Sequence, residues 1–216
     1  MDPDLLTTIL TIAVLGFMAS RLVTGVRVSR SAQGRAVVRE VLARLRWRHV
    51  WPVPFVLTAV IAAATALMAV PGLEWGWWSE LGGEGNPVFG SSEATAGTAW
   101  EWIVPVAFMA LLIPALPLFA NAEERLFRRG AESWTTGKRC WKTLQFGMVH
   151  ALVGIPLGAA LAISLGGAWF LHIYLEGYRR SGSRAEATFE STTAHSAYNG
   201  VIIIVVLIAL AMSAIL

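Results

Sequence analysis

Residues 102–120 read WIVPVAFMALLIPALPLFA, and the ten residues that follow, 121–130, read NAEERLFRRG. The first stretch contains 19 residues and no charged side chain. A helix that crosses the hydrocarbon core of a bilayer needs about 20 predominantly apolar residues, so this stretch predicts a membrane-spanning helix. The second stretch carries two adjacent carboxylates, Glu123 and Glu124, at the point where that helix would leave the membrane.

The composition of the whole chain indicates the same class of protein. Hydrophobic residues make up 56% of its 216 residues and charged residues only 14%, with a mean hydropathy of +0.59. These values exclude an ordinary soluble domain of this size and indicate an integral membrane protein. The single cysteine, Cys140, excludes an internal disulfide.

Five apolar segments predict six membrane-spanning helices, because the fourth segment contains 36 residues and is too long for one helix. Gly154, Pro156 and Gly158 interrupt it, since proline breaks the helical hydrogen-bond ladder and glycine permits a tight turn. We therefore expect a helical hairpin there, within an all-α, polytopic bundle of about six transmembrane helices. The five segments are 5–23, 54–70, 102–120, 143–178 and 193–216.

The positions of the charges predict the orientation of this bundle. All 17 Lys and Arg lie in three windows, 21–48, 125–142 and 179–184. Cytosolic loops are enriched in Lys and Arg, so six spans place all three windows in the cytosol and both termini outside. Five spans would put the third window on the wrong side. The outer loop at about 71–100 has neither Lys nor Arg, but it carries Glu74, Glu80, Glu84 and Glu93.

The arrangement of spans and charges divides the chain into two parts. Residues 1–120 would form three N-terminal spans, with a basic interfacial helix at about 27–48 and the acidic outer loop. In the basic helix, apolar residues recur at helical spacing among arginines, which is typical of a helix lying on anionic lipid. A patch for a substrate or for nucleic acid is the alternative. Residues 121–216 would form the second part, with three motif-bearing helices.

The paired carboxylates at the end of the third span have different expected partners. Glu124 and Arg128 are four residues apart, so they lie on one helical face and are expected to pair. Glu123 lies about 100° around the helix axis and need not share that partner. The motif therefore predicts one neutralised carboxylate and one available carboxylate at a membrane boundary. A solvated helix end is the alternative interpretation.

The histidines strengthen the functional interpretation. His150 and His195 fall at the cytosolic ends of the fourth and sixth spans, whereas His49 is expected at the membrane interface. Phe146 precedes His150 by four residues and Asn199 follows His195 by four, so each pair shares a helical face. Ionisable side chains in spans usually face the bundle interior and are functional candidates. We therefore expect four polar groups to converge at one membrane depth: Glu123, His150, His195 and Asn199.

These motifs resemble those of a known family. EERLFR (123–128) reads as EExxxR, FGMVH (146–150) as FxxxH and HSAYN (195–199) as HxxxN. Their order and spacing, over roughly residues 120–200, resemble the CPBP family of intramembrane endopeptidases, which includes the CAAX proteases and the bacteriocin-processing, Abi-like proteins. The resemblance implies an intramembrane endopeptidase that cleaves a membrane-associated protein or peptide. It also implies that residues 121–216 form the catalytic core and that the membrane is a bacterial plasma membrane. The topology predicted from the charges places the active site toward the cytosol.

The resemblance also implies a role for each motif residue. Glu123 would act as general base, together with His150, to activate the water that attacks the scissile amide. His195 and Asn199 would donate hydrogen bonds to the developing oxyanion. Glu124, Arg128 and Phe146 would support these groups. The expected partners are membrane lipid and a peptide or protein substrate, with no nucleic acid.

Cofactor use has two interpretations. We expect a metal-free glutamate mechanism, because HExxH is absent from the sequence and asparagine is a poor zinc ligand. Zinc held by one glutamate and two histidines is the alternative.

Rival functions are a catalytically silent immunity or membrane protein of the same family, a proton-coupled transporter, and an electron carrier with haem bound by His150, His172 and His195. The haem interpretation gives no role to Glu123 or Asn199.

Overall fold

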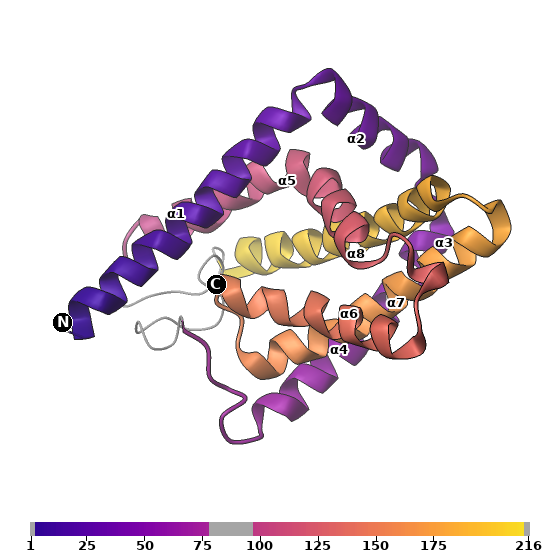
Figure 1. The fold of residues 1–216 in the computed structure, drawn as a ribbon. Helices are drawn as coiled ribbons and strands as arrows, with labels where there is room; N and C mark the ends of the chain where they lie inside the picture. The colour runs from indigo at the N-terminus through magenta and orange to yellow at the C-terminus, as the bar shows by residue number, and fades with distance from the viewer. Residues whose placement is uncertain (1–2, 78–96, 214–216) are drawn as a thin grey trace.

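The computed structural model describes residues 3–77 and 97–213, and every regular element within these ranges is helical (Figure 1). The all-α class expected from the sequence is therefore confirmed. The elements are α1 (Pro3–Ser29), α2 (Ala32–Arg44), α3 (Trp47–Val50), α4 (Val53–Met68), α5 (Trp100–Phe127), η2 (Ala131–Ser133), α6 (Thr136–Met148), η3 (Val149–Val153), α7 (Leu157–Ser181) and α8 (Arg184–Ser213).

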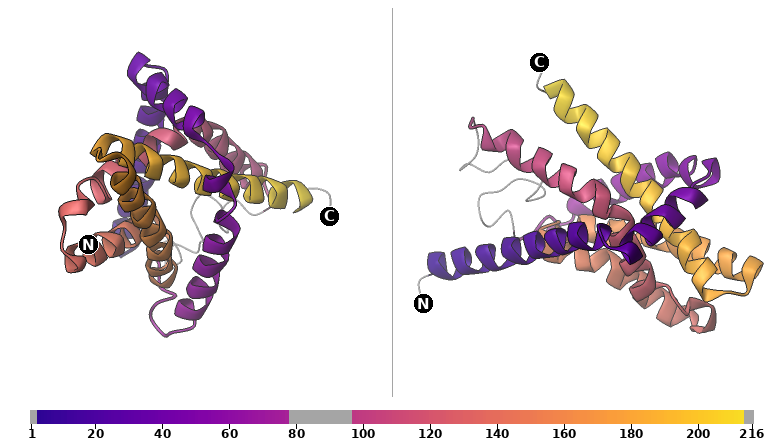
Figure 2. Two further views of the ribbon diagram at one scale, coloured as in Figure 1. Left: turned by 90° about the vertical axis from the view of Figure 1, so that its right-hand side faces the viewer. Right: turned by 90° about the horizontal axis from the view of Figure 1, so that it is seen from above.

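Three helical stretches among the described residues are long and apolar enough to cross a membrane: Trp47–Met68, Leu157–Ser181 and Arg184–Ala209. Large apolar side chains, such as Phe55 and Ile61 on α4, point away from the protein interior. Seen from above, α1, α5 and α8 fan apart toward their outer ends (Figure 2). Of the acidic loop expected from the sequence, Glu80, Glu84 and Glu93 lie outside the described residues.

The break expected in the long apolar segment is present and lies at residues 154–156, but of the two arms that meet there only α7 is among the candidate membrane spans, while the first arm consists of the 13-residue α6 and of η3. Gly154 ends η3 with a φ of 94°, a left-handed conformation that glycine adopts without steric strain. Pro156 then caps α7, where a missing backbone N–H costs nothing. The first N–H groups of α7 are satisfied by the chain that follows α4: Leu157 donates to the Trp75 carbonyl at 2.9 Å and Gly158 to the Leu73 carbonyl at 2.7 Å.

The two arms of this hairpin touch through their backbones. A Cβ atom placed on Gly147 of α6 would lie 2.4 Å from the Ala160 carbonyl oxygen and 2.2 Å from Ser164 Oγ, both on α7. Only glycine permits this approach, and small residues at helix interfaces let the backbones of membrane helices pack closely. Helix α7 also packs against α4 and α8, so it lies at the centre of the bundle.

One hydrophobic core joins five helices. Each of α4, α5, α6, α7 and α8 contributes one large buried side chain to it. These five residues are Val53, Phe127, Phe146, Phe170 and Tyr198. The core lies directly beside the motif residues, so packing of the bundle and positioning of the motifs depend on the same contacts.

The basic segment expected as one interfacial helix over 27–48 is divided instead. Helix α1 continues to Ser29, and α2 begins anew after Ser31, whose hydroxyl accepts a hydrogen bond from the Gly34 backbone N–H at 3.0 Å. His49, expected at the membrane interface, is buried, and its Nε2 lies 3.1 Å from Glu190 Oε1. The sequence did not indicate this contact, because the partner comes from α8, far away in the sequence, and the position of His49 at the membrane interface stays a prediction.

Candidate active site

The carboxylate and the guanidinium predicted to pair on the third apolar helix do so in the protein interior. Arg128 Nη1 donates to Glu124 Oε1 at 2.8 Å, and both side chains are buried. The guanidinium lies over the Phe146 ring, 3.9 Å from its centroid, and its Nη2 donates to the Gly167 carbonyl at 3.4 Å. Burying two charges is costly unless they are paired and hydrogen-bonded, and here both conditions are met.

Two side chains from α8 complete the shell around Glu124. Ser191 Oγ donates to Glu124 Oε2, and it also lies 3.0 Å from the Phe170 carbonyl oxygen. His195 Nδ1 lies 2.9 Å from Glu124 Oε1. An ionised carboxylate can only accept hydrogen bonds, so Nδ1 carries the proton at this contact. We call Glu123, Glu124, Arg128, Ser191 and His195 the carboxylate–histidine cluster.

The orientation of His195 connects the two adjacent glutamates. With Nδ1 directed at Glu124, the opposite nitrogen, Nε2, lies 3.7 Å from Glu123 Oε2. The ring stacks on Phe170 at 4.2 Å between centroids, which fixes its plane. The side chain of Glu123 is 35% exposed, whereas that of Glu124 has no exposed surface. One carboxylate is therefore structural and enclosed, and the other is accessible beside an oriented imidazole.

Phe146 is the ring against which both motif histidines pack. Its centroid lies 5.2 Å from that of His150 and 5.6 Å from that of His195, edge to face in both cases. His150 Nδ1 lies 2.8 Å from the Phe146 carbonyl oxygen. A carbonyl oxygen only accepts, so Nδ1–H donates there and neutral His150 keeps Nε2 as a proton acceptor. The expected packing of Phe146 beside His150 is confirmed.

Among the described residues, the two remaining candidates form no hydrogen bond or ion pair with the cluster. Asn199 is half-buried, one turn beyond His195 on α8, and within the described residues no hydrogen bond joins its side chain to the cluster. His172 lies on an outward face of α7, with its side chain 63% exposed and its Nε2 3.6 Å from Glu176. His172 therefore does not converge with His150 and His195, as a three-histidine haem site requires.

Ser191 was not identified as a candidate from the sequence. A signal for it exists, because Ser191 precedes His195 by four residues and therefore shares its helical face. The contact of His195 with Glu124 was also not anticipated, since the two residues are 71 positions apart. The sequence placed His195 opposite a substrate, whereas the structure places it between two glutamates.

The described part of the chain contains no group of three or more His, Cys, Asp or Glu side chains arranged to hold a metal ion. Comparisons with family models, with curated proteins and with solved structures find no match for this chain.

Proposed function

We propose that this chain is an integral membrane protein and an intramembrane endopeptidase of the CPBP type, which hydrolyses a peptide bond in a membrane-associated protein or peptide. The observation that carries the proposal is the pairing of an accessible carboxylate, Glu123, with an imidazole, His195, that is held by a second, enclosed carboxylate, Glu124. The resemblance of the three motifs supports the same reaction class. No metal is needed for it, since the carboxylate itself supplies the base.

In the proposed reaction, Glu123 removes a proton from a water molecule, and His150, through Nε2, holds that water. The water oxygen bonds to the carbonyl carbon of the scissile amide, and the carbonyl oxygen becomes an oxyanion. Glu123 then returns the proton to the amide nitrogen, the C–N bond breaks as the oxyanion re-forms the carbonyl, and the products are a carboxylic acid, which keeps the second water proton, and an amine. General base catalysis of this kind contributes roughly a hundred- to ten-thousand-fold.

His195 and Asn199 are the proposed oxyanion donors. Since Nδ1–H is already donated to Glu124, His195 donates from Nε2 only as the imidazolium. The fixed stacking on Phe170 means that little reorganisation is needed when charge develops on the oxygen. One preorganised oxyanion donor is worth about a hundred- to a thousand-fold in rate.

The test is a proteolysis assay of membranes that carry wild-type protein, Glu123→Gln or Glu176→Gln, with released peptides read by mass spectrometry. Glu176 is the matched control, because it is a similarly exposed carboxylate that lies outside the cluster. We expect Glu123→Gln to lower peptide release by roughly a hundred-fold or more at equal protein levels. Wild-type release from Glu123→Gln, or no peptides that depend on the wild-type protein, would overturn the proposal and favour a silent relative.

We also propose the six-span topology, with both termini outside and the cluster toward the cytosol, in a bacterial plasma membrane. The three basic windows support it through the positive-inside rule. In a chain with Cys140 replaced by serine, single cysteines at Gly137 and at Ser183 should both react with a membrane-impermeant thiol reagent only from the cytosolic side. Labelling of these two positions from opposite sides would refute the topology.

A further inference from the structure

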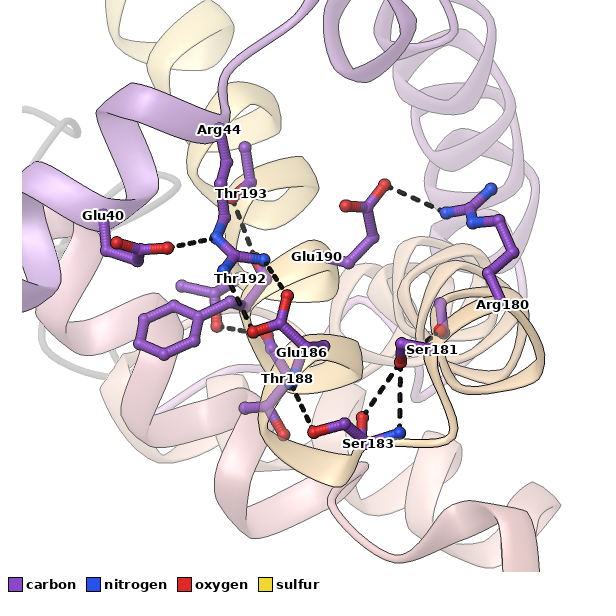
Figure 3. A network of polar contacts seen from close by, with 12 residues as sticks. Glu40, Arg44, Arg180, Ser181, Ser183, Glu186, Thr188, Glu190, Thr192 and Thr193 are labelled. Atoms are coloured by element: carbon purple, nitrogen blue, oxygen red, sulfur yellow. Dashed lines mark hydrogen bonds and ion pairs between the residues drawn. The ribbon is translucent and has the colours of Figure 1, made fainter.

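A cavity of about 320 Å³ lies outside the carboxylate–histidine cluster, between the α2–α3 segment and the α7–α8 turn. Four arginines line it, three from the first segment and one from the end of α7, together with two glutamates from α8 (Figure 3 shows part of this lining). We call it the arginine pocket. These six residues are Arg44, Arg46, Arg48, Arg180, Glu186 and Glu190.

Both glutamates of the arginine pocket are already paired. Glu186 accepts two hydrogen bonds from Arg44, at 2.7 and 3.2 Å, as the dashed lines in Figure 3 indicate. Glu190 Oε1 lies 2.9 Å from Arg48 and 3.2 Å from Arg180. Two further carboxylates pair with the arginines of the pocket from outside its lining, Glu40 with Arg44 at 2.6 Å and Glu176 with Arg180 at 3.3 Å. Arg44, Arg48 and Arg180 therefore each have a carboxylate partner.

Arg46 differs from the other arginines of the pocket. Its Nη1 donates to the backbone carbonyls of Ala43 and Leu45, at 2.8 and 2.9 Å, and among the described residues it forms no ion pair with a carboxylate. No carboxylate in the part of the chain that the structure describes therefore compensates its charge. Guanidinium groups bind phosphate oxygens through parallel N–H···O bonds, so a phosphate is the ligand chemistry that fits this pocket.

The place of the pocket in the fold indicates where such a phosphate comes from. All three candidate membrane helices have one end beside it: Trp47–Met68 and Arg184–Ala209 begin there, and Leu157–Ser181 ends there. Trp47 is 75% exposed on α3, and Trp51 is also exposed one turn later. Exposed tryptophans next to arginines at the end of spanning helices are typical of the headgroup level of a bilayer.

We infer that the arginine pocket binds the phosphate of an anionic lipid headgroup. The lipid would bridge α2–α3 to the α7–α8 turn at the membrane surface, where Arg46 supplies the free charge and Arg180 the opposite wall. This inference concerns a site separate from the proposed active site and holds whether or not the chain is a protease.

The experiment measures lipid binding by the purified full-length protein in neutral detergent, by native mass spectrometry and by the lipid-induced change in Tm. The probes are phosphatidylglycerol, phosphatidylcholine and inorganic phosphate. The variants are Arg46→Gln, the double variant Arg46→Gln/Arg180→Gln, and Arg179→Gln as the control. Arg179 has the same charge and adjoins Arg180 on α7, but it does not line the pocket.

We expect wild type and Arg179→Gln to bind phosphatidylglycerol equally and more tightly than phosphatidylcholine. Arg46→Gln should weaken that binding roughly tenfold, and the double variant further, because charge-assisted hydrogen bonds are lost. Arg46→Gln leaves both glutamates paired, so it tests binding without removing the ion pairs of the fold. Unchanged binding by Arg46→Gln, an equal loss in Arg179→Gln, or no preference for the anionic lipid would overturn the inference. Equal stabilisation by inorganic phosphate alone would assign the pocket to a free anion instead.

Discussion

Replacing Glu124 with glutamine tests whether the enclosed ion pair stabilises the bundle. The substitution keeps the size of the side chain and removes its charge, so Arg128, with a side chain only 1% exposed, becomes an uncompensated buried cation. Removing one partner of a buried ion pair costs about 3–5 kcal/mol. For a chain of this length, that corresponds to a fall in Tm of roughly 6–20 °C. Ser191 and His195 lose the charge on their common acceptor as well.

The assay is thermal unfolding in detergent, followed by circular dichroism, with the yield of monodisperse protein as a second measure. Glu123→Gln is the matched control, since it alters the adjacent, partly exposed glutamate and should unfold within about 2 °C of wild type, as expected for a change of less than about 1 kcal/mol. Adding Arg128→Met to Glu124→Gln should recover part of the lost stability, because no buried charge then remains. A Glu124→Gln protein as stable as Glu123→Gln would refute the structural role assigned to this pair.

Three other predictions concern the candidate site and the hydrogen bonds of Glu132 on η2. His172→Ala should retain far more proteolytic activity than His150→Ala, because His172 lies on an outward face; equal losses in the same peptide assay would favour a three-histidine site. Prolonged treatment with a strong chelator should leave activity unchanged, whereas loss on chelation and recovery with zinc would establish the alternative mechanism. Burial opposes ionisation of Glu132, but hydrogen bonds from Arg184 and Tyr174 outweigh it and lower its pKa. The ionised Glu132 should therefore contribute its full stabilisation above the ordinary glutamate pKa of about 4.3, and this contribution should be lost as the pH falls through the lowered pKa of the folded state. The Tm difference between wild type and Glu132→Gln should accordingly shrink in acid. A Tm difference that grows in acid would contradict this reasoning.

Local patterns in the sequence predicted the local features of the fold. The break near Gly154 and Pro156 follows from backbone chemistry alone, and so does the contact of Glu124 with Arg128 one helical turn away. The division of the basic segment at Ser31 was missed, although a serine hydroxyl commonly caps a helix, because the apolar spacing that predicted the helix lies at 37–45 and carries no information on the residues before Ser31. Spacing along one segment reports a face of a helix, not the residue at which that helix starts.

The contacts that define the site join residues distant in the sequence, and these were only partly predictable. The sequence brought His195 and Glu123 to a common depth, but it did not indicate that His195 lies between both glutamates. His49 illustrates the same limit, since its buried contact with Glu190 spans 141 positions. Which side chain faces which depends on helix rotation and crossing geometry, and those are set by packing that no single segment encodes.

The close contact at Gly147 restricts how α6 and α7 can move relative to each other. Helices separated by side chains can slide or part by changing rotamers, but α6 and α7 touch main chain to main chain and are covalently joined by the short turn at Gly154. Separating them would lose this close contact at Gly147. In the proposed protease, we therefore expect a substrate to enter along another boundary of the bundle, with α6 and α7 moving together.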